Sequence, residues 1–382
     1  MKKHTLLGTA TIAISLGIWG CEKTITPAIE NEPVTTVELK VQHGALAFAS
    51  SEEFAKTMAY FNAIGEDKAR EIVSGLPNFK SLVEITPNDK ADIERLNKAL
   101  WQQQAAIQLS NYDPAIDDVA PPEPLVYDDY LIQDPIMELC LNTYREIIIG
   151  SHFIRVTEHG VFAYTPEQRS NFEIQFGTST FETALQNYYT SSSQNDLQYL
   201  PQVTDNIYLV NRDRDLFSTA TIQQFSTACN GTQLQTNIFG QLTDCNIDID
   251  NRRRYRATVW AQNTGVYSSI GMKTRRQTRF LRVWWNTEGE RLSVEGVGEY
   301  YTKWPNNVPI YYTYTRSGTL IDRTNQRKVS SELPQPWHTG EFGWSSKGPK
   351  FKPAKKYEFK KHESDHYGWI NGVRHHRKIK HN

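Results

Sequence analysis

Beyond its first twenty residues the sequence has no long apolar run, so no later segment is expected to cross a bilayer as a helix. An excess of one charge is also absent, because 42 Lys and Arg residues balance 43 Asp and Glu residues. Neither a Gly-rich phosphate loop nor a G-x-S-x-G motif occurs. The sequence therefore gives no indication of a P-loop enzyme or of an α/β-hydrolase.

Cysteine is scarce, with four in 382 residues. Cys21 closes the N-terminal apolar segment, and three more cysteines follow it. In an oxidising compartment Cys229 and Cys245 are the natural disulfide pair, because the 15 residues between them form a polar stretch with little apolar mass to hold it. Cys140 is then expected to be a lone, buried thiol.

The N-terminus has the pattern of a bacterial lipoprotein signal. The run Leu6–Trp19 is too short to span a bilayer and has the length of a signal-peptide core. It ends in Ile18-Trp19-Gly20-Cys21, which resembles a lipobox: a branched aliphatic residue and a small residue before the cysteine that receives the lipid. Residues 1–20 are thus predicted to be the signal peptide and Cys21 the lipidation site, with a plain secretory signal or a transmembrane anchor as alternatives.

The next segments are predicted to be a tether and a helical unit. Residues 21–43 carry two prolines, four threonines and little apolar mass, as in a lipid-anchored flexible tether. In residues 44–110, Ser50 and Glu53 have capping-box spacing, and Thr86-Pro87 resembles a helix start. Two apolar stripes follow at helical spacing: Phe54, Met58 and Phe61, then Ile93, Leu96, Leu100 and Ile107.

Residues 111–135 are predicted to be an acidic, proline-rich connector and a domain boundary. They contain seven acidic residues, five prolines and no Lys or Arg. Four aspartates are conceivable calcium ligands, although EF-hand spacing is missing. A solvated linker is the favoured interpretation. The four aspartates are Asp117, Asp118, Asp128 and Asp129.

Residues 136–346 are predicted to be a β-rich domain. Residues 145–149, 151–157 and 161–164 alternate as strands, and a helix is expected from Ser179. Residues 191–250 are polar and loop-rich, and the clearest sheet signal follows at 252–315. The fold class is therefore predicted to be α+β, with a helical N-terminal unit before a mainly antiparallel β domain.

The sheet at 252–282 is predicted to have one buried face and one basic face. Tyr255, Ala257 and Val259 alternate with polar residues, while Lys273 and Arg275 hold the opposite parity from Met272. A solvent-facing sheet paired with the acidic connector is the favoured interpretation. The alternative is a surface for anionic groups of glycans or lipopolysaccharide, and nucleic acid is not expected on an exported protein.

The aromatic run from Trp284 to Tyr314 is a possible sugar platform, because ring faces stack on the apolar faces of sugars. Strand alternation places about half of these rings in the core. The candidate binding residues are Trp284, Trp285, Trp304, Arg275 and Arg279.

Residues 347–382 are predicted to be a basic, His-rich tail. His362-Glu363-Ser364-Asp365-His366 is a literal H-E-x-x-H, which on a helix places two zinc ligands one turn apart beside a catalytic Glu. The tail offers no apolar helical face and no later Asp or Glu as a third ligand, although His375 or His376 could still complete a three-His site. A solvated tail is favoured, and no metal or other cofactor is predicted.

The signal, tether, helical unit, acidic connector, the stretch from Leu141-Asn142 to Phe162 and the Arg- and Trp-rich strand pair together resemble uncharacterised lipoproteins of Bacteroidota. The resemblance implies lipid-anchored attachment to the outer membrane, on its periplasmic or exposed side, but it supplies neither an activity nor catalytic residues. We expect a non-enzymatic envelope protein that binds or scaffolds glycan, lipopolysaccharide or envelope proteins. A glycan-binding accessory protein is the second hypothesis and a zinc hydrolase the third.

Overall fold

The structure is a computed structural model, and it describes most of the chain after residue 36. The described residues are 37–96, 126–129, 131–190, 200–210, 235–237, 240–280, 283–303, 310–326, 328–345 and 348–381. The predicted signal peptide, Cys21, Cys229, Trp304 and residues 97–125 lie outside them. No helix in the described part of the chain combines the length and the apolar character needed to span a membrane.

The first sheet has seven strands in the order β1-β2-β4-β5-β6-β8-β7, antiparallel except for the parallel pair β2–β4. Its strands are β1 (Lys40–Gln42), β2 (Ala45–Phe48), β4 (Glu146–Ile149), β5 (His152–Thr157), β6 (Gly160–Tyr164), β7 (Gln202–Thr204) and β8 (Ile207–Leu209). The predicted strands at 145–164 are confirmed. The predicted tether is wrong at its end, because β1 lies inside residues 21–43 and pairs with β2 through the turn at His43-Gly44.

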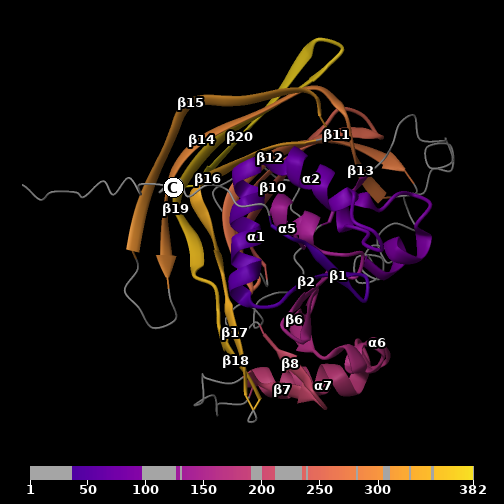
Figure 1. The fold of residues 1–382 in the computed structure, drawn as a ribbon. Coiled ribbons are helices and arrows are strands. Elements are labelled where there is room, and N and C mark those ends of the chain that lie inside the picture. Colours follow the sequence, from indigo (N-terminus) through magenta and orange to yellow (C-terminus); the bar gives the residue numbers. More distant parts are fainter. Residues whose placement is uncertain are drawn as a thin grey trace, which may run out of the picture. The chain divides into compact units, whose positions relative to one another are not determined.

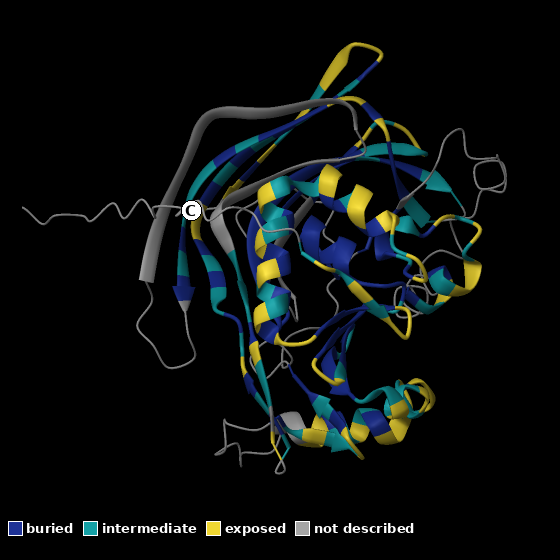
Figure 2. Cartoon of the chain, in the orientation of Figure 1, coloured by how far each residue is buried: buried dark blue, intermediate teal, exposed yellow. Residues whose placement is uncertain are grey.

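Short helices pack around this sheet. They are α1 (Ser51–Ile64), α2 (Glu66–Ser74), η1 (Leu82–Glu84), a helix at 90–96, α5 (Pro135–Cys140), η2 (Pro166–Gln168), α6 (Arg169–Gln175) and α7 (Ser179–Thr190). Ser50 caps α1 as predicted, because its hydroxyl accepts from the Glu53 backbone N–H at 3.2 Å. Phe54, Met58 and Phe61 are buried, and Figure 2 shows exposed residues along the opposite side of α1. The helix predicted at Thr86-Pro87 begins later, at residue 90.

The second sheet contains the strongly alternating residues. Its order is β3-β13-β12-β11-β10-β9, and β16 also pairs with β12. The strands are β3 (Val126–Tyr127), β9 (Gln235–Asn237), β10 (Gly240–Asp248), β11 (Arg253–Asn263), β12 (Tyr267–Phe280), β13 (Val283–Thr287) and β16 (Lys328–Thr339). The prediction that 191–250 is loop-rich is wrong for β7 to β10, where few apolar side chains mark the strands.

The third sheet has the order β15-β14-β19-β20, and a hairpin of β17 (Glu341–Ser345) and β18 (Gly348–Lys352) stands apart from it. The strands are β14 (Gly289–Lys303), β15 (Ile310–Gln326), β19 (Lys356–Ile370) and β20 (Val373–His381). Figure 1 shows β14, β15, β19 and β20 running side by side. The prediction of a solvated tail at 347–382 is therefore wrong.

The second and third sheets form a sandwich. Tyr255, Val259 and Met272 of the second sheet share one core with Leu292 and Phe359 of the third. The other face of the second sheet packs on the helices and first sheet, in a core that runs from Leu46 to Phe351. Residues Thr36–Asn382 thus form one compact unit, which confirms the α+β class but contradicts the predicted domain boundary at 111–135.

Candidate functional site

The H-E-x-x-H motif lies on strand β19 and does not form the helical zinc site. Alternate residues of a strand point to opposite faces. His362 and His366 point into the sandwich and are buried, whereas Glu363 points outward and pairs with Lys378 at 2.8 Å. His375 lies on β20 opposite Gly368, far along the strand from His362. Among the described residues no group of three or more His, Cys, Asp or Glu side chains has metal-site geometry.

The two histidines instead belong to a buried hydrogen-bond chain. Ser364 Oγ lies 2.8 Å from His362 Nε2 and 2.9 Å from His366 Nε2, and His366 Nδ1 lies 2.9 Å from Thr274 Oγ1. The Thr274 hydroxyl donates to the Ser293 carbonyl, so it accepts from His366 Nδ1–H, and His366 Nε2 accepts from Ser364. Burial lowers the pKa of His366 to about 3. The neutral imidazole is therefore part of the core.

The predicted basic face of the second sheet is buried rather than solvent-facing. Arg256 and Arg275 lie opposite each other on β11 and β12 and both pair with Asp128 of the predicted connector. Gln277 Nε2 adds a hydrogen bond to Asp128 at 2.6 Å. Burial alone would raise the pKa of Asp128, but Arg275 and Arg256 hold it well below its usual range. The expected pairing between connector and sheet exists at Asp128, inside the protein.

Asp129 is engaged in the same way. Its carboxylate accepts from Arg145 Nε at 2.7 Å and from the backbone N–H groups of Leu131 and Ile132. The structure therefore does not support a calcium site at Asp128 and Asp129. Asp117 and Asp118 lie outside the described residues.

The binding residues predicted from the aromatic run are not brought together on a surface. Arg275 and Trp285 are buried, and the Trp285 indole donates to the Phe280 carbonyl at 3.0 Å. Trp284 and Arg279 are partly exposed and face each other across β12 and β13, but the guanidinium of Arg254 covers the Trp284 ring at 3.9 Å.

Only one cysteine of the predicted disulfide pair lies among the described residues. Cys245 is disulfide-bonded and buried on β10, while Cys229 lies outside the described residues. The Cys229–Cys245 pairing stays a prediction. Cys140 is a free, buried thiol on α5.

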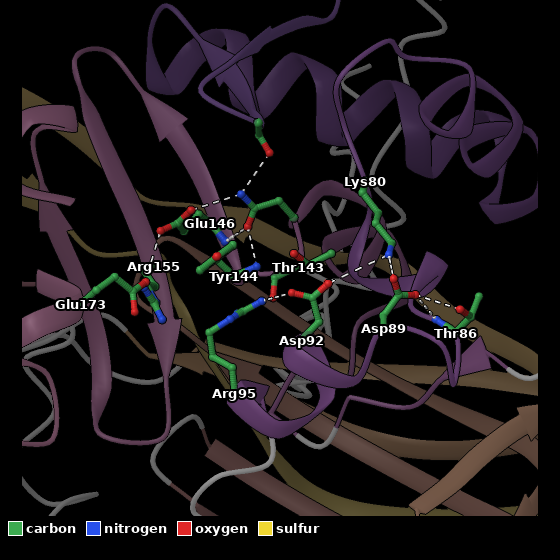
Figure 3. A network of polar contacts seen from close by, with 12 residues as sticks. Lys80, Thr86, Asp89, Asp92, Arg95, Thr143, Tyr144, Glu146, Arg155 and Glu173 are labelled. Carbon is green, nitrogen blue, oxygen red and sulfur yellow. Dashed lines mark hydrogen bonds and ion pairs between the residues drawn. The ribbon is translucent and has the colours of Figure 1, made fainter. Parts of the chain in front are cut away.

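A polar network joins the first sheet to its helices (Figure 3). Arg155 of β5 pairs with Glu146 of β4 and with Glu173 of α6. Glu146 also accepts from the Tyr164 hydroxyl at 2.6 Å and from Arg169 at 2.6 Å.

Tyr144 stands at the centre of the same region. The guanidinium of Arg95 lies 3.6 Å from its ring centroid, Arg169 lies at 4.9 Å and Arg155 at 5.6 Å. Each arginine also pairs with a carboxylate, with Asp92 serving Arg95. This network fastens α6 and the helix at 90–96 to the sheet, and it has no sequence motif because its members are scattered between residues 80 and 173.

The outward face of the third sheet carries a set of rings that the sequence analysis did not single out. On β19, Tyr367 and Trp369 are half-buried and alternate with the buried His366 and Ile370, so they point away from the sandwich core. Gly368 lies between them, and a Cβ there would stand 2.4 Å from the Tyr255 ring. The close packing beneath Gly368 fixes the height of both rings above the core.

The strand register places cations on both sides of these rings. Trp369 lies between Arg291 of β14 and Arg374 of β20, and Tyr367 lies between Ser293 and His376. The Arg291 guanidinium is 4.5 Å from the Trp369 ring centroid, and that of Arg374 is 5.4 Å from the Tyr367 centroid. We call the five residues Arg291, Tyr367, Trp369, Arg374 and His376 the Trp369 platform.

Two contacts hold Tyr367 in place. The His376 ring stacks on it, with centroids 4.7 Å apart and an interplanar angle of 17°. The Tyr367 hydroxyl donates to Glu295 Oε1 at 3.3 Å. The Tyr367 and Trp369 centroids are 6.2 Å apart. The platform is thus a pair of neighbouring, partly exposed rings with hydrogen-bonding groups along its border.

Comparison with known proteins gives little further guidance. No protein-family model and no curated protein matches the chain. Among solved structures, the chain is similar to a DUF4848 family protein from Bacteroides thetaiotaomicron, with 10% identity and a TM-score of 0.20 over 90% of this chain and 100% of that one. A TM-score this low does not establish a common fold.

Proposed function

We propose that the chain is a lipid-anchored protein of the bacterial outer membrane that binds glycan on the Trp369 platform and does not itself catalyse a reaction. The lipobox-like Ile18-Trp19-Gly20-Cys21 supports the anchor. The zinc-hydrolase alternative loses its support, because Glu363 and the two histidines of the motif point to opposite faces of β19.

The observation that carries the proposal is the position of Tyr367 and Trp369, side by side on an outward sheet face. Aromatic rings offer apolar faces that match the C–H faces of sugars, while Arg, His and carboxylate groups at their border suit sugar hydroxyls. Arg291 covers the Trp369 ring in the unbound protein. A cation–π contact at an exposed site contributes only about 0.5–1 kcal/mol, so a sugar can displace it.

The platform is also well placed to act as a preformed site. β19 is hydrogen-bonded to β14 on one side and to β20 on the other, which fixes the backbone beneath both rings. Rings on a regular strand lose little freedom on binding, and this lowers the entropic cost of holding a ligand.

The test compares Trp369→Ala with Trp284→Ala. Both tryptophans are partly exposed and both have an arginine over the ring, but Trp284 lies on β13 of the other sheet. Affinity electrophoresis of the mature protein through gels containing pectin, chondroitin sulfate, xylan or laminarin measures binding, and thermal melts show that each variant is folded.

We expect Trp369→Ala to weaken binding about tenfold, by analogy with the stacking of a base on an aromatic ring, which contributes on the order of 1–3 kcal/mol. Trp284→Ala should bind as the parent protein does. If the loss follows Trp284 instead, the platform is not the site. If no polysaccharide retards the parent protein, the proposed glycan-binding function is wrong.

A further inference from the structure

Charge is distributed unevenly along the outward face of β14, β19 and β20. The register defines successive rows across the three strands. The first row is Arg291, Trp369 and Arg374, and the second is Ser293, Tyr367 and His376. The third row is Glu295, Asp365 and Lys378, and the fourth is Val297, Glu363 and Lys380. Within β14, β19 and β20, the two rows at the Trp369 end contain Arg291, Arg374 and His376 and no acidic residue.

The carboxylates of this face are already engaged. Asp365 bonds to His376 at 2.6 Å and Glu363 to Lys378 at 2.8 Å. Glu295 accepts from Tyr367, and Glu290 accepts from the backbone N–H of Asn371 at 2.6 Å in the β19–β20 turn.

Arg374 is placed differently from these charges. It is exposed, and within the described part of the chain its contact is the ring of Tyr367, with no ion pair to a described carboxylate. A ring face attracts a cation but does not neutralise it.

We propose that the Trp369 platform selects acidic glycans, those whose sugars carry a carboxylate, sulfate or phosphate group. This inference rests on the proposed glycan-binding function and adds the ligand class. Adjacent strands lie about 4.8 Å apart, so the Cα atoms of Arg291 and Arg374 stand roughly 10 Å apart on either side of Trp369. A sugar stacked on Trp369 therefore brings an acidic substituent within reach of a guanidinium on either flank.

Arginine suits this role because its planar guanidinium binds a carboxylate, sulfate or phosphate through two parallel N–H donors. Both arginines also border the aromatic ring that holds the sugar. One ligand thus receives apolar contact and charge recognition from three consecutive strands.

The experiment uses pairs of polysaccharides that differ only in their charge. Polygalacturonic acid is compared with its neutral methyl ester, chondroitin sulfate with desulfated chondroitin, which keeps its carboxylates, and lipopolysaccharide with its dephosphorylated form, which also keeps carboxylates. These pairs separate carboxylate, sulfate and phosphate as the source of the acid. Arg374→Gln is compared with Lys360→Gln, which removes the same charge from an exposed residue at the other end of β19.

We expect the parent protein to prefer the more acidic member of at least one pair. Arg374→Gln should weaken that preferred binding about tenfold, the loss expected for one charge-assisted hydrogen bond, and leave any binding to the neutral methyl ester unchanged. Lys360→Gln should have little effect on either.

Equal binding of the two members in every pair would overturn the inference while leaving glycan binding in place. So would an Arg374→Gln protein that binds like the parent, or equal losses in Arg374→Gln and Lys360→Gln. Absence of binding to all six polysaccharides would remove the proposed function itself.

Discussion

Asp128 is a single carboxylate on which two buried guanidiniums depend. Removing one member of a buried ion pair is costly, because the remaining charge has neither its partner nor water. We predict that Asp128→Asn, which removes the carboxylate charge that Arg256 and Arg275 share, lowers the free energy of unfolding by about 3–5 kcal/mol. Urea denaturation at pH 7 measures the loss.

The matched control for this prediction is Glu52→Gln, which removes an exposed carboxylate from its pair with Lys56 on α1. Exposed pairs contribute little, so the control should unfold at nearly the same urea concentration as the parent protein. An Asp128→Asn protein as stable as this control would show that the cluster is solvated.

His366 predicts a dependence of stability on pH. Its pKa is lowered by burial to about 3, whereas an unfolded histidine has a pKa near 6.5. Between these values the unfolded chain binds a proton that the native protein does not. The free energy of unfolding should therefore fall as the pH drops from about 6.5 towards 3, by at most about 1.4 kcal/mol per pH unit for this residue.

His366→Gln tests the pH dependence, because glutamine keeps a donor and an acceptor for Ser364 and Thr274 but does not titrate. Its urea midpoint should decline less than that of the parent protein between pH 7 and pH 4.5. His43→Asn, at an exposed turn position, is the control. Parallel declines in His366→Gln and the parent protein would contradict the prediction.

For individual residues, the sequence showed which side chains share a strand face but not what covers that face. Tyr255, Val259 and Met272 alternate as predicted and are buried. Lys273 and Arg275, on the opposite face of the sheet, are as deeply buried as these apolar residues. A distant segment covers that face and supplies Asp128 and the Gln133 carbonyl as their partners. Alternation in one strand contains no information about a second layer.

Strand β19 shows how an element can escape sequence analysis. Between Phe359 and Ile370 its inward positions are His362, Ser364, His366 and Gly368, which give no apolar alternation. Hydrogen bonds satisfy the polar groups, and the missing side chain of Gly368 makes room for Tyr255. Tyr367 and Trp369 occupy outward positions of this strand. The platform was therefore not predicted, because the sequence of this segment resembles a basic tail.

The central place of β19 reverses the expectation that residues 347–382 can be deleted without harm. A chain that ends before Lys356 loses the strand paired with β14 and exposes Leu292 and Val294. We predict that it does not melt cooperatively. A chain that ends before Val373 loses β20 alone and should melt cooperatively at a lower temperature than the parent protein.

Circular dichroism during thermal unfolding distinguishes the two truncations. A sharp transition at the parental melting temperature in the shorter chain would show that β19 is dispensable.

Helix α1 contrasts with β19, because its capping residue and its buried face were both predicted from local spacing.

The molecule as a whole follows the predicted α+β class, but its parts are joined more closely than the sequence suggested. Residues 111–135 look like a linker because they are acidic and rich in proline. The described residues near their end, including Tyr127 and Ile132, are nevertheless buried between the second sheet and the helices. Composition predicts solvation only where no partner of opposite charge lies near.

The lipid anchor is the prediction that concerns the whole chain. Cys21→Ser removes the thiol that would receive the lipid. We predict that the parent protein enters the detergent phase of a Triton X-114 extract, whereas the variant stays aqueous or accumulates as an uncleaved precursor. Equal partitioning of the two proteins, with a mature N-terminus away from residue 21, would contradict lipidation.

Strand β20 has a consequence for how copies of the protein behave when they are crowded. It is an edge strand of its sheet, and no described strand pairs with it on the side away from β19. An open strand edge is a template for aggregation. Here Arg374, His376, Lys378 and Lys380 occupy every second position, so two such edges would bring cation against cation. If many copies were crowded together in the plane of a membrane, repulsion between these cationic edges would oppose edge-to-edge strand pairing. The hydrogen bonds inside each sheet would be unaffected.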